Sequence, residues 1–205
     1  MKLRSIVILA AIAIGGLVSY GFVKGEYNDM FKVDQTRLNG MSQVQVQLQR
    51  TADLIPNLMN VVDRYAGFEK DTFKEVAEAR SGLTALAKMD PKDLANKPEL
   101  QKQVVEAQTQ MGQAMVKVNV LSEKYPELKA NGMFKDLMVE MTGSINRITD
   151  ARRKVQNTIQ DYNTAVGQFP RVFYAGFMGF PTRPFFEAEK DAQTVKQYKF
   201  DSQKK

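Results

Sequence analysis

Residues 6–23 form a continuous run without a charged side chain, IVILAAIAIGGLVSYGFV, shortly after Lys2 and Arg4. As an α-helix this run is about 27 Å long, which is just enough to cross the hydrocarbon core of a bilayer. The alternative is a cleaved signal peptide, whose apolar region is normally about 7–15 residues long. This run is longer and ends in an aromatic stretch at 20–23. The sequence therefore favours a short basic N-terminus at 1–5 followed by an uncleaved, single-pass signal-anchor.

The charges on either side of the run bear on its orientation. Three cations, Lys24, Lys32 and Arg37, follow it, and acidic residues contribute little to the positive-inside rule. The charge bias is therefore close to a tie. Two cations directly before the run are typical of a translocating signal-anchor, so we expect the soluble domain to lie outside the cytoplasm.

The composition argues against catalysis. The chain has no cysteine and no histidine, so it lacks a thiol nucleophile, the usual general base and the commonest metal ligand. No nucleophile–base set, metal constellation or phosphate-binding loop is recognisable. The sequence predicts a protein that is not an enzyme, with no catalytic residue, no cofactor and no metal. The net charge of +6 is spread thinly, which favours anionic lipid headgroups over nucleic acid.

Beyond the anchor, the chain has the period of amphipathic helices. Over residues 99–125, apolar residues recur in alternating steps of three and four. Asn96 is the expected N-cap, with Pro98 in the first turn and Glu99 completing a capping box. Pro126 ends this helix, because proline disfavours helical geometry in the residue before it.

A second long helix is predicted over residues 132–168, with Asn131 as its cap and Pro170 as its stop. Its apolar stripe is interrupted only by Arg152, and an unpaired buried guanidinium would cost several kcal/mol. We therefore expect an ion pair with a carboxylate of a neighbouring helix, and the alternative is a site for an anion or a phospholipid headgroup. The candidate carboxylates are Glu69, Glu75 and Glu78. Glu75, Glu78 and Arg80 otherwise suggest a solvated face, and Tyr162 and Asn163 suggest hydrogen bonds across the bundle.

Residues 27–88 are also helical in pattern but contain Pro56, and a proline inside a helix costs about 3 kcal/mol or more. If Asp53 is an N-cap, Pro56 lies in a first turn that does not need its N–H. We therefore expect two helices, at 27–51 and 54–88, with the chain turning back between them. The alternative is one long kinked helix. In either case the sequence predicts an all-α fold, an antiparallel four-helix bundle over 24–168 with coiled-coil-like stripes.

Residues 169–186, here called the aromatic segment, read FPRVFYAGFMGFPTRPFF. This much apolar area must pack on the bundle, enter a membrane interface or hold a partner. If the chain turns back near Asp53, the segment lies next to the membrane, whereas a helix continuing through Pro56 would move it to the far tip. We expect the turn and the membrane-proximal segment. Residues 187–205 are polar and charged, as in a terminal tail.

The chain carries a series of short motifs, which are Tyr27-Asn28, VQVQLQRTADLIPNL (44–58), FEKDTFKEVAEARS (68–81), LSEKYPELKANGMF (121–134), NRITDARR (146–153), DYN (161–163), FP (169–170), GF (179–180) and RPFF (183–186). Together, and in this order, they resemble the LemA family. The chain departs from the family where Ile-Asp-Val-Gln-Leu is usual (Val44-Gln45-Val46-Gln47-Leu48), where His-Glu is usual (Phe68-Glu69), and where a first Tyr-Asn is usual (Val155-Gln156).

The resemblance implies a bacterial, membrane-anchored four-helix bundle without an established enzymatic activity. We therefore expect a single-pass protein of the cytoplasmic membrane. It would act as an interaction or scaffold module of the cell envelope, recruiting protein partners or copies of itself. The alternative is a module that binds lipid surfaces through anionic headgroups.

Overall fold

The computed structural model describes residues 2–186, and the polar tail predicted at 187–205 lies outside the described residues. Within 2–186 the chain forms helices and no strand. The elements are α1 (Lys2–Ala66), α2 (Lys70–Ala87), α3 (Pro91–Asn96), α4 (Pro98–Lys124), α5 (Pro126–Ala130), α6 (Gly132–Gly167) and the short 3-10 helix η1 (Arg171–Phe173).

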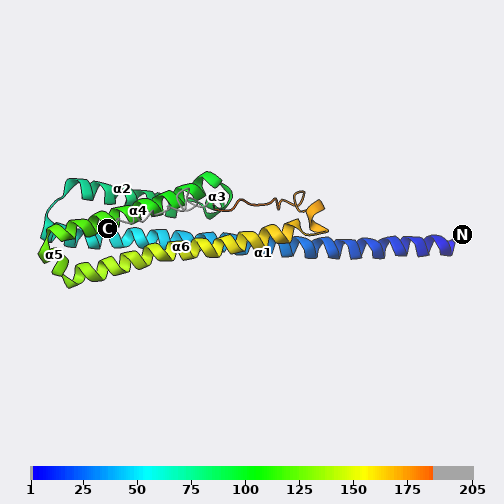
Figure 1. Ribbon diagram of the computed structural model, residues 1–205. Helices are drawn as coiled ribbons and strands as arrows, with labels where there is room; N and C mark the ends of the chain where they lie inside the picture. The colour runs from blue at the N-terminus through cyan, green and yellow to red at the C-terminus, as the bar shows by residue number, and fades with distance from the viewer. Residues whose placement is uncertain (1, 187–205) are drawn as a thin grey trace, which may run out of the picture.

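Four long helices make the bundle, which confirms the predicted all-α fold (Figure 1). α6 lies antiparallel along α1, and this pair is the most extensive helix contact. α2 and α4 cover only the part of the pair farthest from residue 2. We call the end with α5 the distal end and the end next to residues 6–23 the proximal end. The core is apolar, and its fully buried members include Met41, Leu48, Leu58, Leu83, Met111, Met141 and Ile148.

α1 continues through Pro56, so the predicted break at Asp53 is wrong. Proline has no N–H, so the carbonyl of Ala52, four residues earlier, loses its helical partner. Arg80 of α2 donates from Nε to this carbonyl oxygen at 3.2 Å. Asp53 accepts a hydrogen bond from Gln49 and caps no helix. The continuous helix is therefore stabilised by Arg80, a side chain from a neighbouring helix. From the sequence, Arg80 was expected to lie on a solvated face.

The chain reverses at Gly67, directly after α1. Gly67 has φ +69°, the left-handed conformation that commonly ends a helix, and its N–H donates to the carbonyl of Asp63 at 3.0 Å. We expected a continuous α1 to move the aromatic segment to the far tip, and this was wrong. The reversal is only displaced from Asp53 to Gly67, so α6 still ends at the proximal end (Figure 1).

The first part of α1 extends alone beyond the bundle (Figure 1). Residues 6–23 are all exposed, and from Ile6 onward the helix is long and apolar enough to cross a membrane. Two other boundary predictions are confirmed. Asn131 caps α6 by accepting from the N–H of Phe134 at 3.0 Å, and α4 ends immediately before Tyr125-Pro126.

Candidate functional site at the proximal end

The aromatic segment returns to α1 just beyond the apolar run. Arg171 pairs with the carboxylate of Glu26 and lies 3.3 Å from that of Asp29. The hydroxyl of Tyr174 donates to Glu26 at 3.1 Å, and the ring of Phe180 meets that of Tyr27 edge-on at 5.3 Å. These contacts join residues far apart in sequence within one turn of α1.

Where Arg171 and Tyr174 meet Glu26, a junction named here for these three residues, each group shifts the pKa of the others. The hydrogen bond from Arg171 lowers the pKa of Glu26 below its usual 4.5, and the same bond raises the pKa of Arg171. The pKa of the Tyr174 hydroxyl is raised, first by burial and then by its bond to ionised Glu26. The junction is therefore most stable with Glu26 ionised and Arg171 and Tyr174 protonated.

Two side-chain amides of α6 hold the rest of the aromatic segment. Asn163 exchanges two hydrogen bonds with the backbone of Arg183 (2.9 and 2.8 Å), and Gln156 does the same with Phe186 (2.9 and 3.0 Å). Seven helical residues rise about 10.5 Å, and three extended residues span about 10 Å. The spacing of the amides thus matches that of the backbone groups they bind.

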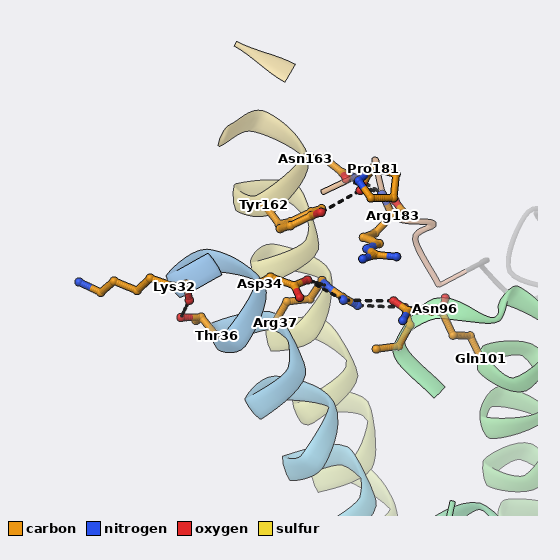
Figure 2. Close-up of polar contacts among 11 residues, drawn as sticks. Lys32, Asp34, Thr36, Arg37, Asn96, Gln101, Tyr162, Asn163, Pro181 and Arg183 are labelled. Atoms are coloured by element: carbon orange, nitrogen blue, oxygen red, sulfur yellow. Dashed lines mark hydrogen bonds and ion pairs between the residues drawn. The ribbon is translucent and has the colours of Figure 1, made fainter. Parts of the chain in front are cut away.

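Arg37 of α1 is the most deeply buried charge, with 1% of its surface exposed. Its guanidinium donates twice to Asp34 (2.7 and 3.0 Å), to the carbonyl of Ala95 (3.0 Å) and to the side-chain oxygen of Asn96 (3.1 Å) (Figure 2). It also lies 5.5 Å from the ring centre of Tyr162. One guanidinium thereby connects α1, the α3–α4 junction and α6.

Tyr162 completes this cluster from α6. Its hydroxyl donates to the carbonyl of Pro181 at 2.8 Å, and the guanidinium of Arg183 lies 5.8 Å from the centre of its ring (Figure 2). Burial is the main reason that the pKa of this phenol is raised. Tyr162 and Asn163 were expected to form hydrogen bonds across the bundle, but their hydrogen bonds are with the aromatic segment.

The buried arginine is Arg37, whereas the sequence pattern predicted Arg152. Arg37 was counted among the cations flanking the apolar run, although it lies on the same helical stripe as Met30, Met41 and Leu48. Asp34, one turn earlier, was the second available signal. Asn96, predicted as an N-cap, instead accepts from Arg37, and α4 begins after Lys97 without a side-chain cap.

Arg152 is only half-buried, and it donates to the side-chain oxygen of Gln108 at 2.8 Å. Its guanidinium also lies 5.5 Å from the ring centre of Phe186. The carboxylates proposed for it bind other groups. Glu69 accepts from the Tyr125 hydroxyl, which raises the pKa of that tyrosine, Glu75 pairs with Lys117, and Glu78 lies 3.9 Å from Lys74.

The aromatic segment is divided between the core and the surface. Phe180 and Phe186 are buried, the first at the proximal end and the second farther along α6 at Gln156. The expectation that all of its phenylalanines lie at the proximal end is therefore wrong for Phe186. The large apolar side chains left exposed are Phe169 (81%), Val172 (54%), Phe173 (74%), Phe177 (98%) and Phe185 (47%).

An open groove lies between α4 and α6 in the distal half. This groove has a volume of about 550 Å³, and every residue lining it is uncharged. Val116 and Val139, on its two walls, are 63% and 74% exposed. We call it the α4–α6 groove, lined by Gly112, Met115, Val116, Asn119, Met138, Val139, Thr142, Ile145 and Asn146.

Within residues 2–186, no three acidic side chains converge to hold a metal ion. The polar clusters of the proximal end are made of arginine, carboxylate, amide and phenol groups that bind one another or the backbone. Such an arrangement suits fixing one segment of chain against another.

A sequence model of the LemA family matches residues 40–200. The chain belongs to the LemA family. Magnetosome protein MamQ of Magnetospirillum gryphiswaldense is 21% identical to this LemA protein over 203 residues, covering 91% of this chain and 74% of that protein. Magnetosome proteins MamQ 1 and MamQ 2 of Paramagnetospirillum magneticum are each 21% identical over 183 residues, covering 82% of this chain and 67% of each relative.

Two departures of this LemA protein from the usual motifs have a structural explanation. Gln45 stands where an aspartate is usual, and its amide donates to the carbonyls of Leu86 (3.2 Å) and Met89 (2.7 Å) at the end of α2. A carboxylate could not donate these bonds. Gln156 replaces the asparagine of the first Tyr-Asn and still binds the aromatic segment through its amide.

Proposed function

We propose that this LemA protein is a non-enzymatic, membrane-anchored interaction module. Residues 6–23 would span the membrane once, with the bundle at 24–168 and the aromatic segment at 169–186. The single observation that carries the proposal is the continuity of α1, which is one helix from the apolar run into the bundle core. A bundle built on its own anchor presents its surfaces at a fixed place above the bilayer.

The α4–α6 groove is the surface we assign to a protein partner. Its uncharged lining would leave charged groups of a partner without counterions, so it favours an apolar, uncharged face. Gly112 has no other atom within 4 Å of where a Cβ would stand, so a backbone can approach closely there. An amphipathic helix laid along two splayed helices is a common recognition mode. We therefore propose an apolar helical face of another protein, or of a second copy, as the occupant.

For the cellular location, we propose the cytoplasmic membrane of a bacterium, with the bundle outside the cytoplasm. Lys2 and Arg4 lie directly before the run, as cations do in a translocating signal-anchor, and they support this orientation. A reporter active only outside the cytoplasm, fused after Lys205, is expected to be active, whereas activity of a cytoplasm-only reporter would reverse the orientation.

The groove is tested by photocrosslinking in intact cells. A benzoylphenylalanine would replace Val116 or Val139 on the two walls, or Lys102 on the exposed face of α4 as the matched control. We expect the same protein to be captured from both walls and not from position 102. The capture should disappear when Val139→Asp is added to the Val116 probe. Equal capture at all three positions, or capture that survives the aspartate, would contradict a partner in the groove.

A further inference from the structure

Among residues 24–186, the most exposed phenylalanines gather at one place, the first part of the aromatic segment. Phe177 is 98% exposed and Phe173 is 74% exposed, although the same segment buries Phe180 almost completely. They are not the loose end of an unpacked tail, because the chain around them is held on both sides. Such a concentration of apolar surface needs an explanation beyond bundle packing.

The contacts of the aromatic segment with α1 give its distance, along the helix axis, from the end of the apolar run. Glu26 and Tyr27, which hold Arg171 and Phe180, lie three and four residues beyond the apolar run. They are therefore about 4.5–6 Å above its end along the helix axis. The headgroup layer of a bilayer is about 5–8 Å thick, taken as half the difference between total and hydrocarbon thickness. Contacts at this height place the segment within that layer.

The segment is also fixed in position. The pairs of Arg171 and Tyr174 with Glu26 hold its first part on one side, and the contact of Phe180 with Tyr27 holds it on the other. Val172, Phe173 and Phe177 lie between these contacts, in η1 and the turns after it, and Phe169 lies in the turn just before η1. Figure 1 shows this part of the chain beside α1 at the proximal end, where only the apolar run of α1 extends further.

We propose that Phe169, Val172, Phe173 and Phe177 form a second membrane contact, inserted in the headgroup region of the bilayer that α1 crosses. Apolar side chains at this depth are removed from water, as aromatic residues commonly are at membrane interfaces. The proposal rests on the proposed function only in requiring that residues 6–23 span the bilayer. It adds that the bundle touches the bilayer beside its anchor, with one defined face.

The absence of cysteine makes the test direct. Single variants Phe173→Cys and Phe177→Cys of the full chain would carry a nitroxide, in vesicles of phosphatidylcholine with phosphatidylglycerol. Collisions with dissolved oxygen and with a water-soluble nickel complex would be measured by paramagnetic resonance. Met133→Cys, 64% exposed at the distal start of α6, is the matched control. We expect labels at 173 and 177 to show a smaller nickel effect and a larger oxygen effect than the label at 133.

Each other outcome overturns the inference. Nickel effects at 173 and 177 equal to that at 133 would place the segment in water. Loss of both the nickel and the oxygen effects would indicate burial in protein, such as a second copy. A label at Ile12→Cys separates this failure from failure of the anchor, because it reports the spanning helix independently. A label at 12 exposed to nickel would overturn the anchor and the second contact together.

Discussion

The proximal and distal halves of the bundle are held by different forces. At the proximal end, guanidinium, amide and phenol groups bind partners on segments distant in sequence, as Arg37 does with Ala95 and Asn96. In the distal half, stability comes mainly from apolar packing around Leu58, Leu83 and Met141. The distal half leaves the α4–α6 groove unfilled, whereas the proximal end has a segment of chain fixed across it.

The difference shows which surface is free to bind a partner. Polar contacts are directional and hold one arrangement, because each lost bond leaves a buried group without a partner. Apolar contacts without such restraints allow helices to be splayed and a groove to remain open. A fixed proximal end and an open distal groove suit a module that must keep its place at a membrane while its outer half binds.

The largest expected effect is on the proximal end. Arg37→Met leaves Asp34, whose side chain is 15% exposed, without its cation and the carbonyl of Ala95 without its donor. We therefore expect the free energy of unfolding to fall by about 3 kcal/mol, the low end of the range for a broken buried pair. The measurement is urea unfolding of the full chain in mild detergent, followed by circular dichroism. The matched control is Arg153→Met, whose exposed arginine lies 3.7 Å from Asp150 and should matter by less than about 1 kcal/mol. Arg152→Met should also be tolerated, and equal losses for Arg37→Met and Arg153→Met would refute the distinction.

A smaller effect is expected in the distal half, where one polar contact replaces a missing backbone bond. Arg80→Met removes the donor to the carbonyl of Ala52, which should lower stability by about 1–2 kcal/mol. In a Pro56→Ala background the helical N–H returns to that carbonyl, so the same substitution should have almost no effect. Unfolding of the four proteins in a double-mutant cycle measures this coupling. Equal effects of Arg80→Met in both backgrounds would show that Arg80 does not compensate for Pro56.

The smallest effect concerns pH at the junction of Glu26 and Arg171. The pKa of Glu26 is lowered in the folded protein, so its contribution is complete above its usual 4.5 and is lost as pH falls through the lowered value. We expect a nitroxide at position 177, in detergent, to become more mobile on acidification below about pH 4.5. Glu26→Gln should make it mobile at every pH and remove the transition. A transition that persists in Glu26→Gln would assign it to another group, such as Asp29.

Local patterns were sufficient for most of the fold. The stripe over 99–125, the cap at Asn131 and the stop at Pro126 depend on neighbours in sequence, and the structure confirms them. The break at Pro56 was wrongly predicted because its remedy, Arg80, comes from another helix and follows from no local rule. In this helix, the carbonyl that Pro56 leaves free is bound by another group, and the helix continues.

The candidate site was harder to predict, for the same reason. The apolar richness of the aromatic segment was evident, but which phenylalanines are buried depends on where Tyr27 and Gln156 hold it. Arg37 could have been found from its place in the apolar stripe and from Asp34 one turn earlier. Its bonds to Ala95 and Asn96 could not, because they join positions nearly sixty residues apart.

Because α1 is unbroken, a tilt at its N-terminal end also displaces its far end. From Val23 to Ala66 the helix is about 65 Å long, and spanning helices tilt by about 20° on average. A tilt of that size in the bilayer displaces the far end of the helix sideways by roughly 20 Å. If residues 6–23 span the bilayer as proposed, a bilayer core thinner than this run would tilt the helix and move the outer half of the bundle sideways. The lateral position of the α4–α6 groove would then depend on the lipid around the anchor.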